Sequence, residues 1–203
     1  MDPTIHSEWR EMVRRDNLDP MRQAIERHAG NEDADRIMEG RERVRKSTPP
    51  DEVAKRTSSA VSRMDDLLDA ETRRLIMGEL GRNCATFNSR VMQATVNRRK
   101  KHGTLEEFIE SEIRKPPRGT RLERDGDRII QVYTPRSWTR PMRCYCAFIN
   151  RLPEDVNASL TYCECSRAFV ETVWEAVTGK PVMVELLQST ISGADECKFA
   201  IYP

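Results

Sequence analysis

Six cysteines give this chain its clearest capacity for chemistry, and five of them are close together near the C-terminus. They are Cys84, Cys144, Cys146, Cys163, Cys165 and Cys197. A thiolate binds soft metals and attacks electrophiles, so the cysteines indicate either a metal site or reactive thiols. A third alternative is that they pack as small hydrophobic side chains, which is the favoured interpretation for Cys84 taken alone.

The metal hypothesis uses the two closely spaced pairs, Cys144-Tyr-Cys146 and Cys163-Glu-Cys165. These four are expected to be the ligands, with Cys197 and Cys84 next in line. The spacing is C-x-C, not the C-x₂-C of common zinc ribbons. Zinc is nevertheless expected ahead of an iron–sulfur cluster, because none of the ferredoxin spacings occurs.

The thiol-enzyme hypothesis makes Cys165 the candidate catalytic residue. It lies nearest the expected start of a helix, where the positive end of the dipole favours a thiolate. The three histidines, His6, His28 and His102, lie outside the cysteine cluster in the sequence. A Cys/His catalytic pair is therefore not supported.

Strands and one helix must position these thiols. Residues 143–149 alternate, which predicts a strand with Cys144 and Cys146 on one face. Residues 166–178 have a helical apolar pattern, with Ser166 as the expected N-cap and a glycine after the last turn. Residues 181–189 and the segment around Cys197 are expected to pair as antiparallel strands.

Upstream of this region, a capping box at Thr104 predicts a short amphipathic helix, and residues 121–134 predict a β-hairpin that turns at Asp125-Gly126. The loop that follows combines aromatic and arginine side chains and is a candidate rim for a polar or anionic ligand. A plain surface loop is the alternative. The candidate ligand-binding residues are Tyr133, Arg136, Trp138 and Arg140.

Helical apolar periodicity dominates from residue 51 to residue 92. The first 50 residues are charge-rich and thinly apolar, which predicts a solvated helical extension or arm, with a role in homo-oligomerisation or partner binding. The expected fold is therefore α+β: an antiparallel sheet of about four to five strands packed with helices, preceded by the helical extension. The expected domains are an arm over 1–50 and a cysteine-motif domain over 51–203.

Charge and hydropathy narrow the choice of partner. The net charge is +1 although 33% of residues are charged. One dense basic run, residues 98–102, has no accompanying nucleic-acid motif, so nucleic-acid binding is not expected. No apolar run approaches the length of a membrane span, and the first twenty residues lack a signal-peptide pattern. A reducing cytoplasm with free thiols is the expected location.

The C-terminal segment resembles a widespread prokaryotic group of uncharacterised proteins. The matching residues are the two C-x-C pairs, Trp174-Glu-Ala-Val-Thr-Gly-Lys-Pro-Val-Met-Val-Glu185 and Gly193-Ala-Asp-Glu-Cys197-Lys-Phe-Ala-Ile201. The closing strand pair is similar to 4-vinyl-reductase-type domains, which are regarded as small-molecule binders. A second, weaker likeness is to the amino-thiazoline-carboxylate hydrolase family.

The resemblance covers roughly residues 70–203 and implies helices packed on an antiparallel sheet. It departs from the group's pattern at Ser166-Arg-Ala-Phe169 and in the longer, arginine-rich loop after Tyr133. The leading hypothesis is a small-molecule- or metal-binding sensor module with a cysteine-lined site. A thiol-dependent hydrolase or redox enzyme, and an interaction protein that acts through its N-terminal arm, are the alternatives.

Overall fold

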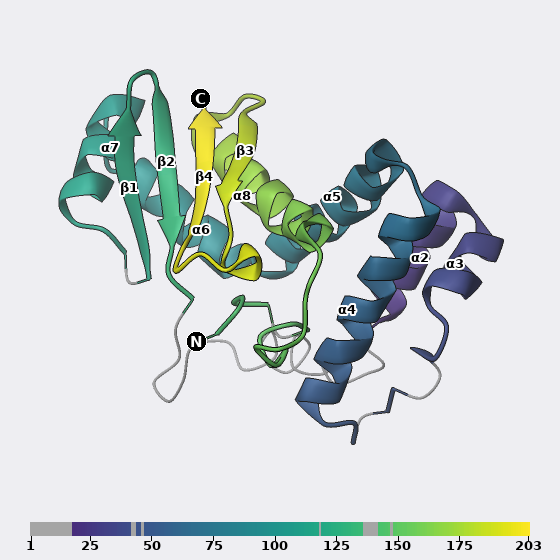
Figure 1. Cartoon of the computed structure of the whole chain (residues 1–203). Coiled ribbons are helices and arrows are strands. Elements are labelled where there is room, and N and C mark those ends of the chain that lie inside the picture. The colour runs from purple at the N-terminus through teal and green to yellow at the C-terminus, as the bar shows by residue number, and fades with distance from the viewer. Residues whose placement is uncertain (1–17, 42–43, 46, 118, 136–141, 147) are drawn as a thin grey trace.

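A computed structural model describes residues 18–41, 44–45, 47–117, 119–135, 142–146 and 148–203. Labels follow Figure 1. The helices are α2 (Asp19–Ala29), α3 (Asn31–Ile37), α4 (Pro50–Leu67), α5 (Ala70–Phe87), α6 (Ser89–Arg99), α7 (Leu105–Arg114) and α8 (Cys163–Thr178), with short 3₁₀ turns η2 (Leu160–Tyr162) and η3 (Thr190–Ser192). The strands are β1 (Thr120–Asp125), β2 (Arg128–Tyr133), β3 (Met183–Gln188) and β4 (Cys197–Tyr202).

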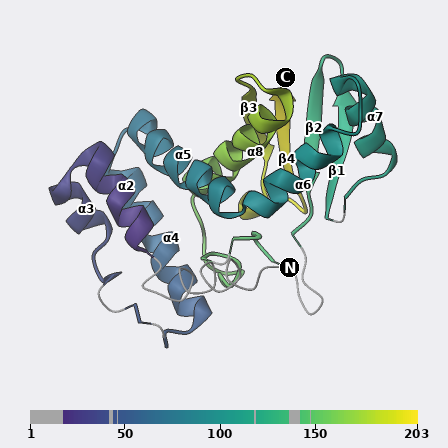
Figure 2. The same cartoon turned by 180° about the vertical axis from the view of Figure 1, so that it is seen from behind.

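The fold is α+β, as the sequence predicts. The four strands form one antiparallel sheet in the order β1-β2-β4-β3. Figure 2 shows α8 and α6 lying across one face of this sheet, while α2, α3 and α4 gather at the far end of the molecule. Helix α5 runs between the two parts and packs along α8.

Two apolar clusters hold these parts together. The sheet cluster joins the inner faces of the strands to α7 and α8, with Phe108, Trp174 and Phe199 among its largest members. The Trp174 indole also donates a hydrogen bond to the buried Gln131 side chain, 2.6 Å away. That bond satisfies the two polar groups which burial would otherwise leave unpaired.

The helical cluster fills the space between α2, α3, α4, α5 and the segment before α8. Residues 18–44 contribute many of its buried side chains, including Leu18, Ile25 and Ile37. The described part of the N-terminal segment is therefore not the solvated arm that the sequence predicts. Its charges face outward while a sparse apolar stripe is enough to dock it on α5.

The hairpin is present as predicted. β1 and β2 pair from Thr120↔Tyr133 to Asp125↔Arg128. The turn between them contains Gly126, whose φ of 59° lies in the left-handed region that glycine adopts without strain.

The strand predicted over residues 143–149 is wrong. The sheet ends at β1 and β3, and the described residues of this segment pair with neither edge strand. The segment turns on itself instead: the amides of Ile149 and Asn150 both donate to the carbonyl of Cys146.

An ion pair fastens the hairpin to the start of β4. The Arg121 guanidinium donates two hydrogen bonds to the Glu196 carboxylate, at 2.6 and 2.8 Å, and the Thr134 hydroxyl donates a third at 2.9 Å. The Arg121 bonds are the main reason that the pKa of Glu196 falls from 4.5 to about 2.

This pair predicts a specific acid sensitivity. Because the folded-state pKa of Glu196 is below its unfolded value, the pair stabilises the fold fully above about pH 4.5, and the contribution disappears as pH falls towards 2. Partial exposure limits it to about 0.5–1 kcal/mol. We expect Glu196→Gln to lower the free energy of unfolding at pH 7 but not at pH 2, measured by urea denaturation. An equal loss at both pH values would contradict the assignment.

Candidate functional site

The six cysteines form no disulfide bonds, and they differ in what their sulfur atoms contact. Cys84, Cys146 and Cys165, which we call the pocket thiols, line one cavity. Cys163 and Cys197, the strand-end thiols, lie beside Ser189 where β3 ends and β4 begins. Cys144 lies between the two groups, close enough for Cys146, Cys163 and Cys197 to influence its pKa.

The start of α8 explains why Cys163 and Cys165 separate. The sequence predicts a helix that begins at Ser166, but the structure begins it at Cys163, after a 3₁₀ turn capped by Ser159. Residues two positions apart on a helix point in different directions. Cys163 therefore faces Ser189, whereas Cys165 faces α5 and the cavity.

A close helix crossing brings Cys165 to α5. At Gly81, a Cβ atom would lie 2.2 Å from the backbone oxygen of Cys165 and 2.8 Å from the Cβ of Ala168. Only glycine allows the two backbones to approach this closely. Cys84 is one turn further along α5 and lies on the wall of the same cavity.

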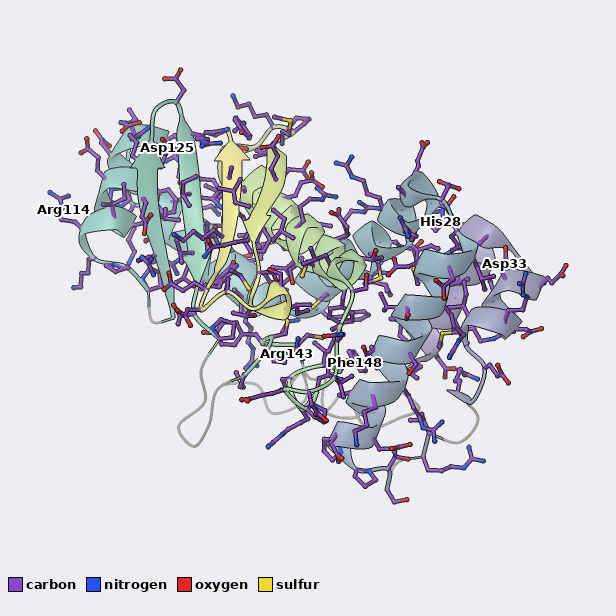
Figure 3. All side chains as sticks on the ribbon, in the orientation of Figure 1. His28, Asp33, Arg114, Asp125, Arg143 and Phe148 are labelled. Atoms are coloured by element: carbon purple, nitrogen blue, oxygen red, sulfur yellow. The ribbon has the colours of Figure 1, made fainter. Side chains whose placement is uncertain are left out.

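The cavity has a volume of about 130 Å³ and lies between α2, α5, the start of α8 and the turn after Cys144. None of its described lining residues is charged. The lining consists of Leu18, Pro20, Met21, Met77, Leu80, Asn83, Cys84, Phe87, Asn88, Cys146, Phe148, Tyr162 and Cys165. In Figure 3, Phe148 lies between the sheet and the helices of the N-terminal part.

Two neighbouring polar side chains hold pocket thiols in place. The hydroxyl of the buried Tyr162 donates to Cys146 Sγ at 3.0 Å. The Asn88 amide, which follows the last residue of α5, donates to the carbonyl of Cys84 at 2.9 Å and to its Sγ at 3.3 Å. These contacts fix where the sulfur atoms lie on the cavity wall.

The strand-end thiols belong to a hydroxyl network. Cys163 Sγ is 3.0 Å from Ser189 Oγ, and Cys197 Sγ is 3.4 Å from Thr190 Oγ1. The Thr190 hydroxyl donates its one proton to the carbonyl of Arg143 at 2.6 Å, so Cys197 is the donor to Thr190. None of the residues in this network lines the cavity that Cys84, Cys146 and Cys165 share.

Arg143 fastens the segment that carries Cys144 and Cys146. Its guanidinium donates to the carbonyls of Pro153, Val156 and Ile191, and Figure 3 shows Arg143 below the lower end of the sheet. The Arg143 carbonyl is itself held by Thr190. One side chain therefore ties the turn to η3 and to the segment before α8.

Electrostatics works against a nucleophilic role for Cys165. Burial raises the pKa of Cys165 well above its ordinary value, and the neighbouring Cys146 raises it further. Burial also raises the pKa of Cys84 and of Cys163 to about 11, and raises that of Cys144 and Cys146. The positive end of the helix dipole does not offset this desolvation, so the thiol form is favoured at neutral pH.

The predicted zinc site has no complete ligand set in the described part of the chain. No three His, Cys, Asp or Glu side chains there are arranged to hold a metal ion. Zinc in structural sites takes four ligands in a tetrahedron. The four expected ligands, Cys144, Cys146, Cys163 and Cys165, belong to one apolar cluster, but no three of them are arranged to hold a metal ion, and zinc binding remains a prediction.

The predicted ligand-binding loop is not part of the cavity wall that the structure describes. Arg136, Trp138 and Arg140 lie outside the described residues. Tyr133 lies on the sheet, where its ring packs edge-on against Tyr145 and Phe199 and its hydroxyl accepts a hydrogen bond from Gln131. Burial raises its pKa above the ordinary value.

Several cavity residues were not predicted from the sequence as site residues. Met77 and Leu80 share one face of α5 with the predicted Cys84 at helical spacing, which is a signal for a buried stripe but not for a cavity. Leu18 and Met21 belong to the segment predicted as solvated, and Tyr162 to a short turn. Their convergence depends on contacts between residues far apart in the chain.

A second, larger hollow of about 440 Å³ lies beside α2 and α3, lined by Arg22, Asp35, Met38, Glu39, Gly40 and Arg41. Its charges neutralise one another: Arg22 pairs with Asp35 and Glu26, and Arg41 pairs with Asp19. The hollow is polar and open, and no cysteine is among its described lining residues. The pocket is the better candidate site.

Comparison with known proteins adds no relative: no family model, curated protein or solved structure matches the chain. The similarity to 4-vinyl-reductase-type domains therefore stays an expectation from the sequence. No helix in the described part of the chain is long and apolar enough to cross a membrane.

Proposed function

We propose that this protein is a sensor or binding module whose ligand occupies the pocket lined by Cys84, Cys146 and Cys165. The observation that carries the proposal is the cavity itself: three thiols from three separate parts of the chain line one apolar hollow. Apolar cavities with a few fixed polar groups are the usual form of small-molecule sites.

The size and charge of the pocket limit the ligand. A volume of about 130 Å³ is close to that of an apolar cavity which, at roughly 150 Å³, binds benzene. A charged ligand would lose its hydration without gaining a partner, because no charged side chain is among the described lining residues. The ligand is therefore small and uncharged, or it becomes neutral when it binds.

The other hypotheses have less support. A thiol-dependent hydrolase or redox enzyme needs an accessible thiolate, and burial raises the pKa of Cys165 and its neighbours. An interaction protein acting through residues 1–50 must present a free surface, whereas Leu18 and Ile25 of this segment are buried against the rest of the chain. Unpaired cysteines fit a reducing cytoplasm.

Filling the pocket tests the proposal. We expect benzene, used as a probe, to stabilise the native protein against heat, by about 2.7 kcal/mol at 100 times its Kd. Cys84→Leu puts a larger apolar side chain on the cavity wall, where leucine is also a good helix former. This variant should bind benzene at least about tenfold more weakly, a loss of about 1.4 kcal/mol in binding energy.

The matched control is Cys197→Ala, which removes a half-buried thiol that does not line the pocket. It should bind benzene as the native protein does, measured by calorimetry and by the shift in Tm. If benzene stabilises Cys84→Leu and Cys197→Ala equally, or fails to bind the native protein, the pocket is not the ligand site.

A further inference from the structure

The pocket wall is rich in sulfur. Of the thirteen described side chains that line it, five contain sulfur: Met21, Met77, Cys84, Cys146 and Cys165. The whole chain, in contrast, has six cysteines and nine methionines among 203 residues. The five side chains come from α2, α5, α8 and the turn after Cys144, so a ligand in the cavity meets sulfur from four separate segments.

Three aromatic rings also line the pocket, those of Phe87, Phe148 and Tyr162. In the sheet cluster, aromatic rings pair with one another, as Phe108 does edge-on with Trp174. None of the three pocket rings forms such a pair with another ring in the described part of the chain. A ligand can therefore be their aromatic partner.

Both features favour an aromatic ring over a saturated one. Thioether sulfur makes favourable contacts with an aromatic ring at about 5 Å, often at the ring edge. Two aromatic rings that meet edge-to-face or offset-stacked also gain energy beyond the burial of their surfaces. A saturated ring has no π system and makes neither kind of contact. Because no charged side chain is among the described lining residues, the ring must carry no charged group into the cavity.

We propose that the ligand of this pocket is a small, uncharged molecule with an aromatic ring, which Met77 and Phe87 distinguish from a saturated ring. The inference rests on the proposed function, since it names the class of ligand for the same cavity. Met77 is buried on the face of α5 that forms the cavity wall. Phe87 is the last residue of α5, and its side chain lies where the cavity meets solvent.

The affinities of the full chain for benzene and for cyclohexane, measured by calorimetry, test the proposal. Benzene should bind more tightly. Met77→Leu nearly conserves the volume and removes the sulfur, so it should reduce the ratio of the two affinities by about 2–10-fold without unfolding the protein. Phe87→Leu removes an exposed ring and should reduce the ratio by a similar factor.

Met64→Leu is the matched control, because Met64 is buried like Met77 but is not among the residues that line the pocket. It should leave the ratio of affinities unchanged, with folding of every variant checked by circular dichroism. A preference for benzene that came only from its size would survive in all three variants. An unchanged ratio in both Met77→Leu and Phe87→Leu, or an equal reduction in Met64→Leu, would overturn the inference.

Methyl NMR gives a second readout that does not depend on a substitution. With ¹³C-labelled methionine methyl groups, the ring current of bound benzene should shift the Met21 and Met77 signals, and should leave the signal of Met183, exposed on β3, in place. Cyclohexane has no ring current and should shift them much less. If the two rings bind with equal affinity, the inference fails and the pocket remains the ligand site. If neither binds, both proposals fail.

Discussion

Gly81→Ala is expected to lower the free energy of unfolding by about 2 kcal/mol or more. Overpacking of a core typically costs about 1–3 kcal/mol, and occasionally more. The added methyl group would lie 2.2 Å from the Cys165 carbonyl oxygen, which belongs to helix backbone and cannot rotate away. Helices α5 and α8 must therefore move apart. Since their crossing positions Cys84 against Cys165, we also expect weaker binding of any pocket ligand.

Gly78→Ala is the matched control in the same helix. There the nearest atoms to an added Cβ belong to the flexible guanidinium of Arg82, at 3.3 Å. Alanine should stabilise the helix by up to about 1 kcal/mol relative to glycine. The two substitutions should thus change the free energy of unfolding in opposite directions, measured by urea denaturation. Equal effects would show that the close approach at Gly81 does not control the packing.

Arg143→Ala is expected to lower the free energy of unfolding by about 3 kcal/mol, because three carbonyl groups lose a charged donor in a half-buried place. It should also weaken binding in the pocket. The turn that carries Cys146 is tied by this guanidinium to η3 and to the segment before α8, and without it the Cys146 sulfur loses its fixed position.

The control for Arg143 is Arg151→Ala, an exposed arginine in the same segment. It should change stability by less than about 0.5 kcal/mol, as surface substitutions usually do. Urea denaturation measures the stabilities and calorimetry with benzene measures the binding. Similar losses in both variants would mean that Arg143 acts only through its charge. If Arg143→Ala lowers stability but binds benzene as the native protein does, the Arg143 contacts do not control binding in the pocket.

Local sequence signals predicted most of the elements correctly. The hairpin follows from alternating residues on both sides of Asp125-Gly126, and α7 from the capping box at Thr104, which is present with both of its hydrogen bonds. Gly179, with a φ of 73°, ends α8 where the sequence placed the end of the helix. Each of these features is decided by residues within a few positions of one another.

The errors occur where distant contacts decide the structure. Residues 143–149 alternate like a strand, yet the described residues among them join no sheet, and the Arg143 side chain bonds to carbonyls up to 48 residues away. The sparse apolar residues around Met21 and Ile25 gave no sign of burial, because the helix that covers them, α5, begins some fifty residues later.

By itself, the sequence determined the α+β class, the hairpin and the closing strand pair. It also indicated that the cysteines are the main candidate site residues. It could not determine how those cysteines divide. Cys163 and Cys165 point apart because α8 begins three residues earlier than its apolar pattern indicates. Cys84 reaches Cys165 because Gly81 lets two helix backbones touch. A pocket is a property of side chains that converge from separate elements, and only tertiary packing brings them together.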